Sequence, residues 1–329
     1  MTTLTDTPTP AGPSLIDRLA TLWRRHGWLL AALLAATLLT INLVAQPNIS
    51  WPYMLATFAP LAICAMATTP AIIAGRGGLD VSISPMMTFL TIVFCGGLIP
   101  IGLGGWIAFP IILVVGAALG ALNGAITVWL RLPAIVVTLS MYFIYYGLSM
   151  ALAPSPLSAG RRSWVGTFAG EFGPFPAALV LILLPVVAWF LLMRTLRGRQ
   201  LLAVGANDAT ALASGVPVAG IRIMAFALGG FMAGIGAIAL LALVRIADAS
   251  QATAYTLISI AAVALGGTSL AGGRGGVVGP LLGAACIFLM QSLLTILQIN
   301  QAWLGIFYGG LLLLAVVLGA ALTSRGAAQ

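Results

Sequence analysis

The sequence predicts an all-α, polytopic membrane protein with about ten transmembrane helices and cytoplasmic N- and C-termini. Hydrophobic residues make up 61% of the 329 residues and charged residues only 6%, whereas soluble domains carry about a quarter charged residues. The mean hydropathy is +1.14. A span needs about 20 apolar residues, and runs of this length fill almost the whole chain. A soluble fold, with or without a single anchor, is therefore excluded.

Ten apolar runs are predicted as spans: Trp28–Ala45, Tyr53–Ile73, Pro85–Pro100, Trp106–Leu130, Pro133–Ala153, Ala177–Met193, Ile223–Val244, Tyr255–Ala271, Val277–Leu297 and Ala302–Leu322. The third is short, so we expect it to tilt little or to be partly re-entrant. The transmembrane domain then covers residues 28–322, between a disordered, cytoplasmic N-terminal segment (1–27) and a cytoplasmic tail (323–329).

The distribution of arginine tests this arrangement independently of hydropathy. All 14 basic residues are arginine. With the N-terminus inside, 11 of them fall in cytoplasmic segments, and only Arg161, Arg162 and Arg245 fall outside. Basic residues collect on the cytoplasmic side of membrane proteins, so the charge pattern supports both the number of spans and their orientation.

The two longest polar connections are predicted on opposite sides, Pro154–Pro176 outside and Arg194–Arg222 inside. The inner one contains a run, Asn207–Ser214, that is compatible with a short helix. Asn207 or Asp208 can cap its start, and Gly215 can end it. Such a helix suits docking to a cytoplasmic partner, although the residues alone are equally compatible with a solvated loop.

A glycine-rich tetrapeptide occurs twice on the predicted cytoplasmic side, as Gly75–Gly78 after the second span and as Gly273–Gly276 after the eighth. Corresponding glycine interruptions in two halves of a chain are typical of transporters, but a glycine-rich membrane protein can also repeat such a sequence by chance. The candidate residues of these turns are Gly77, Gly78, Asp80, Gly273, Arg274 and Gly275. Asp80 is also suited to capping the helix that follows it.

Reactive side chains are scarce. The single histidine is His26, beside two arginines before the first span. No charged residue is predicted inside a span, although such residues usually mark proton relays and ion coupling. The pattern argues against a proton-coupled carrier and an intramembrane protease, and we predict no catalytic site and no metal site. A phosphate-binding loop with the Gly-x-x-x-x-Gly-Lys pattern is also absent, so another chain must hydrolyse ATP if ATP drives transport.

Neutral polar side chains remain inside the predicted bundle. Thr138, Tyr142, Tyr145 and Ser149 fall close to one face of the fifth span, and Asn123 lies in the fourth. Hydroxyl and amide groups can exchange hydrogen bonds with a neutral, polyhydroxylated solute without trapping it. The alternative is hydrogen bonding between helices. These five residues are our candidates for a translocation path.

Five ordered segments resemble one family. They are Gly77–Ser84, Asn123-Gly124, Pro133–Leu139, Gly198–Val216 and Leu265–Gly275. Over roughly residues 49–317 the chain is similar to the permease subunits of ribose-type (simple-sugar and autoinducer-2) ABC importers. It departs from the family pattern at Ser84, where glycine is usual, and at Tyr255–Ser259, which lacks the acidic residue often found there.

The resemblance implies a type II-like importer bundle in a bacterial inner membrane that translocates a monosaccharide or similar solute. The partners it implies are a second permease subunit in a homodimer or heterodimer, an external substrate-binding protein and a cytoplasmic ATPase that binds ATP and magnesium. The loop that couples to the ATPase would contain Asn207, Asp208, Ala211, Ser214 and Gly215. An ion-coupled carrier or a passive channel is the alternative.

Overall fold

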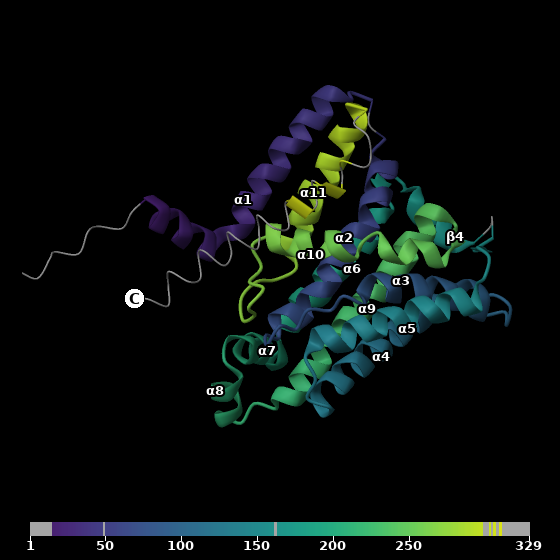
Figure 1. The fold of residues 1–329 in the computed structure, drawn as a ribbon. Helices are drawn as coiled ribbons and strands as arrows, with labels where there is room; N and C mark the ends of the chain where they lie inside the picture. The colour runs from purple at the N-terminus through teal and green to yellow at the C-terminus, as the bar shows by residue number, and fades with distance from the viewer. Residues whose placement is uncertain are drawn as a thin grey trace, which may run out of the picture.

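The computed structural model describes residues 15–48, 50–160 and 163–298, together with 303, 305–306 and 309–310. Its helices are α1 Leu15–Ala45, α2 Trp51–Ile73, α3 Ile83–Ile92, α4 Ala108–Trp129, α5 Ala134–Leu152, α6 Ala178–Met193, α7 Leu196–Ala206, α8 Asp208–Ala213, α9 Val218–Val244, α10 Thr256–Leu265 and α11 Val278–Ile296. These helices form one bundle (Figure 1).

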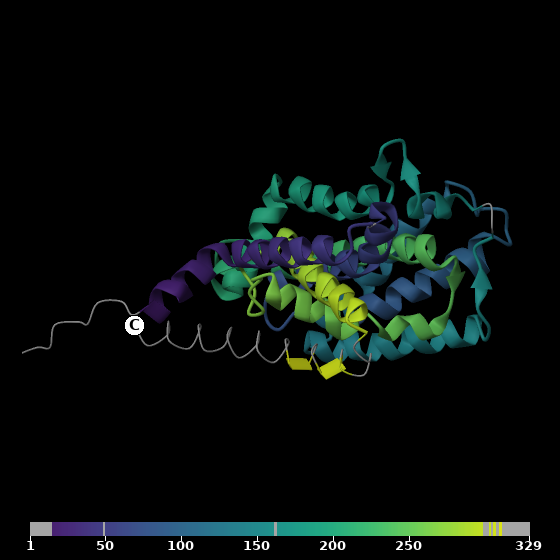
Figure 2. The same cartoon turned by 90° about the horizontal axis from the view of Figure 1, so that it is seen from above.

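Short elements complete the outer side of the bundle. A π-helical turn, η1 (Val93–Leu98), continues α3, and 3₁₀ turns form η2 (Trp164–Ala169) and η3 (Ala249–Thr253). Strand β1 (Leu157–Ser158) pairs antiparallel with β4 (Ile246–Ala247), and β2 (Glu171–Phe172) pairs with β3 (Phe175–Pro176) in a hairpin. The β2–β3 hairpin projects sideways from the bundle in Figure 2.

The all-α prediction is confirmed, and the first nine predicted spans all correspond to helices in the described part of the chain. Six of these helices are long and apolar enough to cross a membrane, and α6 with α7 forms a further candidate bent by 87°. The predicted tenth span and the C-terminal tail lie almost wholly outside the described residues, as do residues 1–14. Residues 15–27 were predicted to be disordered, but they form the first part of α1, which begins at Leu15.

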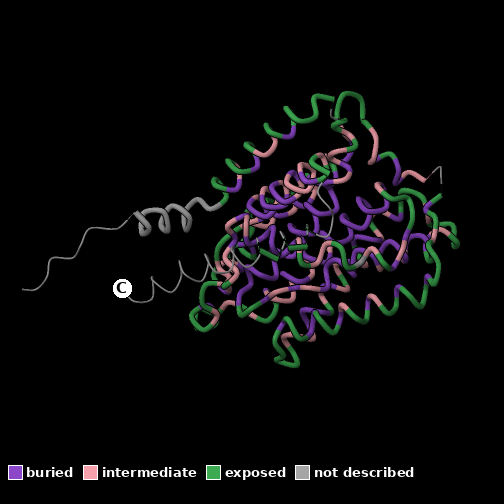
Figure 3. Tube along the Cα trace, turned by 45° about the horizontal axis from the view of Figure 1, so that its top comes forward, coloured by how far each residue is buried: buried purple, intermediate pink, exposed green. Residues whose placement is uncertain are grey.

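Small residues allow the helices at the centre to approach closely. Within the apolar window of α2 94% of residues are buried, against 17% for α1 at the edge, a contrast visible in Figure 3. Helix α4 packs along α9, where a Cβ at Gly124 would lie 2.9 Å from Cα of Ile223 and one at Gly116 would collide with the carbonyl of Gly230. Glycines at every fourth position are the usual device for such close helix contacts in membranes.

Two of the predicted spans are half-length helices. The third span is α3 with η1, consistent with the short span that the sequence predicts. The eighth is helical only as far as Leu265, so its predicted extension to Ala271 is wrong. The chain leaves the helix at Gly266 and enters a turn in which Gly267, Gly272 and Gly273 have positive φ, a conformation that glycine adopts without steric cost.

Candidate functional site

The inner connection folds as a helix, a tight turn and a second short helix. Helix α7 was not predicted, whereas α8 agrees with the predicted run. The Asn207 side chain accepts a hydrogen bond from the Thr210 amide at 3.1 Å, and Gly215, at φ 78°, follows the end of α8. Both the predicted cap and the predicted stop are confirmed.

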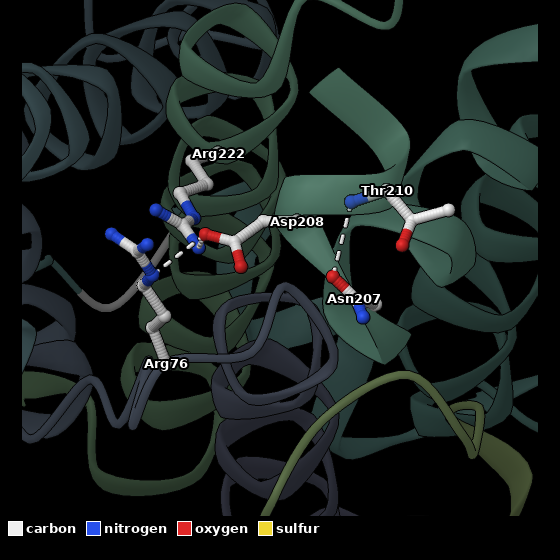
Figure 4. Close-up of polar contacts among 5 residues, drawn as sticks. All are labelled: Arg76, Asn207, Asp208, Thr210 and Arg222. Carbon is white, nitrogen blue, oxygen red and sulfur yellow. Dashed lines mark hydrogen bonds and ion pairs between the residues drawn. The ribbon is translucent and has the colours of Figure 1, made fainter. Parts of the chain in front are cut away.

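Asp208, the first residue of α8, joins three elements. Its Oδ2 atom lies 2.6 Å from Nε of Arg76, in the α2–α3 turn, and 2.9 Å from Nη2 of Arg222, near the start of α9. Figure 4 shows both guanidinium groups converging on this carboxylate. The Arg222 side chain is only 16% exposed, whereas that of Arg76 is 71% exposed. We call Arg76, Asp208 and Arg222 the charge triad; the sequence identified only its aspartate.

The other predicted residues of this connection differ in exposure. Ser214 donates to the Thr210 carbonyl at 2.9 Å, which stabilises the end of α8. Ala211 is only 6% exposed and packs against the hydrophobic core, whereas Leu212 is 64% exposed. Leu212, which was not predicted, is therefore the large apolar side chain that α8 exposes to a partner, whereas Ala211 is not available.

The two repeated glycine turns meet in space, together with the end of α7. Gly273 donates its N–H to the Ile73 carbonyl at 3.0 Å. A Cβ at Gly272 would lie 2.5 Å from Cα of Gly75, and one at Gly205 would collide with the Ile73 carbonyl and with Gly273. We call Gly75, Gly205, Gly272 and Gly273 the glycine junction. Any larger side chain there would separate three backbone segments that touch.

The remaining predicted turn residues surround this junction. Gly77 and Gly275 have positive φ, at 65° and 127°. Gly78 packs so closely that a Cβ would collide with the Ala71 carbonyl. The carbonyl of Arg274 accepts a hydrogen bond from the Ser269 amide at 3.2 Å. Because both turns carry left-handed glycines and pack on each other, their resemblance in sequence corresponds to a shared structural role.

Asp80 belongs to a buried polar cluster that also contains Ser82, Asn123 and Tyr145. Oδ1 of Asp80 accepts from the amide and the hydroxyl of Ser82, at 2.9 and 2.6 Å. Asn123 donates to the Ser82 hydroxyl at 2.8 Å, and Tyr145 donates to Asn123 Oδ1 at 3.0 Å. Asp80 is 1% exposed, and in the described part of the chain its Oδ2 has no hydrogen-bond partner. The predicted cytoplasmic turn therefore folds inward against α4 and α5.

The five path candidates differ in their hydrogen bonds and in their burial. Thr138 donates to the Leu79 carbonyl at 3.1 Å, so α5 holds the α2–α3 turn. Thr138 and Ser149 are fully buried and Tyr145 nearly so, while Tyr142 is half-buried and packs against the ring of Phe143 at 5.3 Å. In this conformation Asn123, Thr138 and Tyr145 bond to the protein itself.

No metal centre is found in the described part of the chain, because no three His, Cys, Asp or Glu side chains gather there. The charge triad and the glycine junction connect the inner connection with the turns before α3 and after α10. The buried polar cluster connects the start of α3 with α4 and α5.

Comparison with known proteins gives consistent results. Residues 50–316 match the family model described as "Branched-chain amino acid transport system / permease component". The ribose import permease protein RbsC of Escherichia coli K12 is 33% identical over 264 residues, covering 78% of this chain and 81% of the relative. The autoinducer 2 import system permease protein LsrC of Shigella flexneri is 34% identical over 249 residues, covering 73% and 70%.

A ribose import permease of Haemophilus influenzae is 29% identical over 246 residues, covering 73% of this chain and 76% of the relative. No solved structure matches the chain. The family model covers most of the sequence, and its match includes all the segments on which the resemblance was recognised. The chain therefore belongs to the permease family of the ribose-type ABC importers.

Proposed function

We propose that this inner-membrane protein is the transmembrane subunit of an ATP-driven importer for a monosaccharide or similar small polyhydroxylated solute. It would pair with a second permease subunit, receive solute from an external binding protein and catalyse no reaction itself. A separate ATPase would bind ATP and magnesium. The relatives named for ribose and autoinducer 2 support this solute class, as do the neutral hydroxyl and amide groups of α4 and α5.

The observation that carries the coupling role is the placement of α8. This helix carries Leu212, an apolar side chain that is 64% exposed and lines a cavity together with Asp208. Exposed apolar anchors of this kind are typical of protein interfaces. Its first residue, Asp208, is bonded to the turn before α3 and to α9. A partner that moves α8 would therefore pull on both elements.

The glycine junction offers a second connection from the same loop. Gly205 lies three residues before α8 and touches the turns that precede α3 and follow α10. Because backbone touches backbone there, with no flexible side chain between, a displacement of α7 cannot be absorbed locally. We infer that α7 and α8 move the two half-helices together.

The polar cluster is our proposed link to the solute path. Asn123 donates a hydrogen bond to Ser82, the residue before α3, and Tyr145 in turn donates one to Asn123. When α3 moves, these bonds must break or rearrange, and their donors and acceptors become free for solute hydroxyls. The remaining path candidates on α5 are Tyr142 and Ser149.

An exchange at Leu212 tests the docking role. We expect Leu212→Glu to lower ATP-dependent uptake by at least about tenfold, because a carboxylate buried without a partner costs several kcal/mol. Leu196→Glu is the matched control, since Leu196 is also exposed on the inner connection, at 66%, but lies outside α8. Normal uptake and ATPase binding by the Leu212 variant would contradict docking on this face.

Solute class is tested separately, by uptake of labelled solute into proteoliposomes that contain the permease, the ATPase and the binding protein. Ribose or a related sugar should be accumulated, and excess leucine should not compete.

One observation favours a second candidate function, that of an ion-coupled carrier. Asp80 is a buried carboxylate with an oxygen that has no hydrogen-bond partner among the described residues, and such groups often mark ion coupling. A carrier would transport without ATP, which the ATP-driven importer would not.

A further inference from the structure

A cavity of about 860 Å³ opens beside α8 on the cytoplasmic side. Its walls come from the α2–α3 turn, the α4–α5 connection, α8 and the first turns of α9. Arg76, Arg131, Asp208 and Arg222 are its charged residues, and most of the remaining lining is apolar. The cavity therefore combines three guanidinium groups with a single carboxylate.

The residues that the structure describes do not neutralise the positive charge of this cavity. Asp208 is already shared between Arg76 and Arg222, and Arg131 makes no ion pair within the described ranges. Nε of Arg222 is buried and has no hydrogen-bond partner among the described residues. A buried donor without an acceptor is costly, so the cavity is suited to an anion that brings acceptor oxygens.

The backbone conformation of two lining residues also indicates a ligand-binding site. Arg76 and Arg131 both have positive φ, at 52° and 54°, a region in which non-glycine residues are uncommon. Two arginines in unfavourable backbone conformations line one cavity, and strained residues of this kind cluster at ligand-binding sites. Glycine would adopt this φ without strain at both positions. We therefore infer that the arginines are present for their side chains.

The rim of the cavity indicates where the anion comes from. At the end of α4 and in the loop after it, Trp129, Leu130 and Leu132 are 76%, 64% and 43% exposed. Exposed tryptophan beside arginine is typical of the level of lipid headgroups, and basic pockets between helices on the cytoplasmic side suit anionic headgroups. We propose that the cavity binds the phosphate group of an anionic phospholipid from the cytoplasmic leaflet, with Arg131 and Arg222 as its ligands.

Lipid retention by the purified full-length subunit tests this site without the ATPase. The protein is placed in vesicles of equal phosphatidylglycerol and phosphatidylcholine, extracted in mild detergent, and the retained lipids are counted by native mass spectrometry. We expect phosphatidylglycerol to be retained in preference to phosphatidylcholine. Arg131→Gln should weaken its retention about fivefold, the contribution of one basic residue near an anionic surface.

Two further variants make the result interpretable. Arg131→Gly removes the charge and also relieves the positive φ, so backbone strain at this position cannot explain a loss of lipid in this variant. Arg197→Gln removes an exposed arginine of the inner connection that does not line the cavity, and it should retain lipid like the wild type. The proposal does not require that the ATPase docks on α8.

Several outcomes would overturn the proposal. Equal retention of the two lipids, or unchanged retention in both Arg131 variants, would show that the cavity holds no anionic headgroup. Thermal stabilisation of the delipidated subunit by millimolar inorganic phosphate, equal to that by phosphatidylglycerol, would indicate a free-phosphate site instead. An effect of Arg131→Gln that emerges only when the ATPase is added would assign the cavity to that protein.

Discussion

The long connections on the two sides of the bundle are held by different forces. On the outer side, the Trp164 ring stacks on Trp106 with 4.6 Å between ring centroids and meets Phe168 edge-on. Its indole N–H donates to the Gly104 carbonyl at 2.9 Å, and Arg245 donates to the Gly166 carbonyl at 3.0 Å. On the inner side, α7 and α8 are held by the charge triad and the glycine junction.

This difference indicates which side can receive a signal. Aromatic packing loses much contact area for a small displacement, so the outer connection is suited to closing and stabilising the bundle. The Arg76–Asp208 ion pair lies near water, where such pairs are weak, and the close glycine contacts leave no side chain to absorb a displacement. The inner connection is therefore the side at which a partner can shift elements relative to one another, and four substitutions test this contrast.

The largest effect is expected at the glycine junction. Gly205→Val places carbon atoms where the backbones of Ile73 and Gly273 already lie, and we expect a loss of about 4 kcal/mol or more in unfolding free energy. Thermal unfolding in detergent measures this. Gly220→Ala is the control, because nothing lies within 4 Å of a Cβ there. Equal stability of the two variants would show that the junction is loosely packed.

The outer side should lose stability without losing coupling. Trp164→Ala removes the stacked ring and its hydrogen bond, and is expected to cost about 3 kcal/mol. Folded protein that remains should import the same amount of solute per ATP hydrolysed. Trp129→Ala serves for comparison, since that ring is 76% exposed and should matter little for unfolding. A changed solute-to-ATP ratio in the Trp164 variant would remove the contrast between the two sides.

At the charge triad we expect coupling to be lost in addition to some stability. Asp208→Asn weakens two charge-assisted bonds and leaves the largely buried Arg222 without its counter-ion, at a cost of about 2 kcal/mol. We expect ATP hydrolysis by the assembled importer to continue while solute uptake per ATP falls several-fold. Arg199→Gln, on the exposed surface of α7, is the corresponding control. An unchanged ratio in Asp208→Asn would exclude the triad from coupling.

The smallest effect is expected in the polar cluster. Tyr145→Phe removes the hydrogen bond to Asn123 and keeps the buried ring, so it should lower the unfolding free energy by about 1 kcal/mol. A second consequence concerns transport: if the cluster lies on the solute path, the apparent affinity for external solute should change as well. A variant that is less stable but transports normally would restrict the cluster to a structural role.

Sequence reasoning succeeded where the cause is local. Long apolar runs predicted α2, α4 and α5 to within two residues at each end, and Asn207 and Gly215 correctly marked the ends of α8. It failed where the cause is distant in the chain. The Gly266-Gly267 pair is a local signal for the early end of α10 that the predicted span overran, whereas nothing in the local pattern shows that Asp80 folds inward. The pairing of Asp208 with Arg222 depends on how the connection between α8 and α9 folds back.

The glycine turns lie between these cases. Their repetition is visible in the sequence, but their contact is a tertiary fact that a tetrapeptide does not encode. Similarly, the helical periodicity correctly placed Thr138, Tyr145 and Ser149 on one buried face, whereas Tyr142 is half-buried because it lies at the margin of that face.

The most direct test of the account measures solute accumulation in proteoliposomes under two sources of energy. The account predicts that the permease with its ATPase and binding protein concentrates a sugar when ATP is supplied. It also predicts that the permease alone does not do so under an imposed proton or sodium gradient. Uphill accumulation by the subunit alone under such a gradient would contradict it and would point to the buried carboxylate of Asp80 as the coupling group.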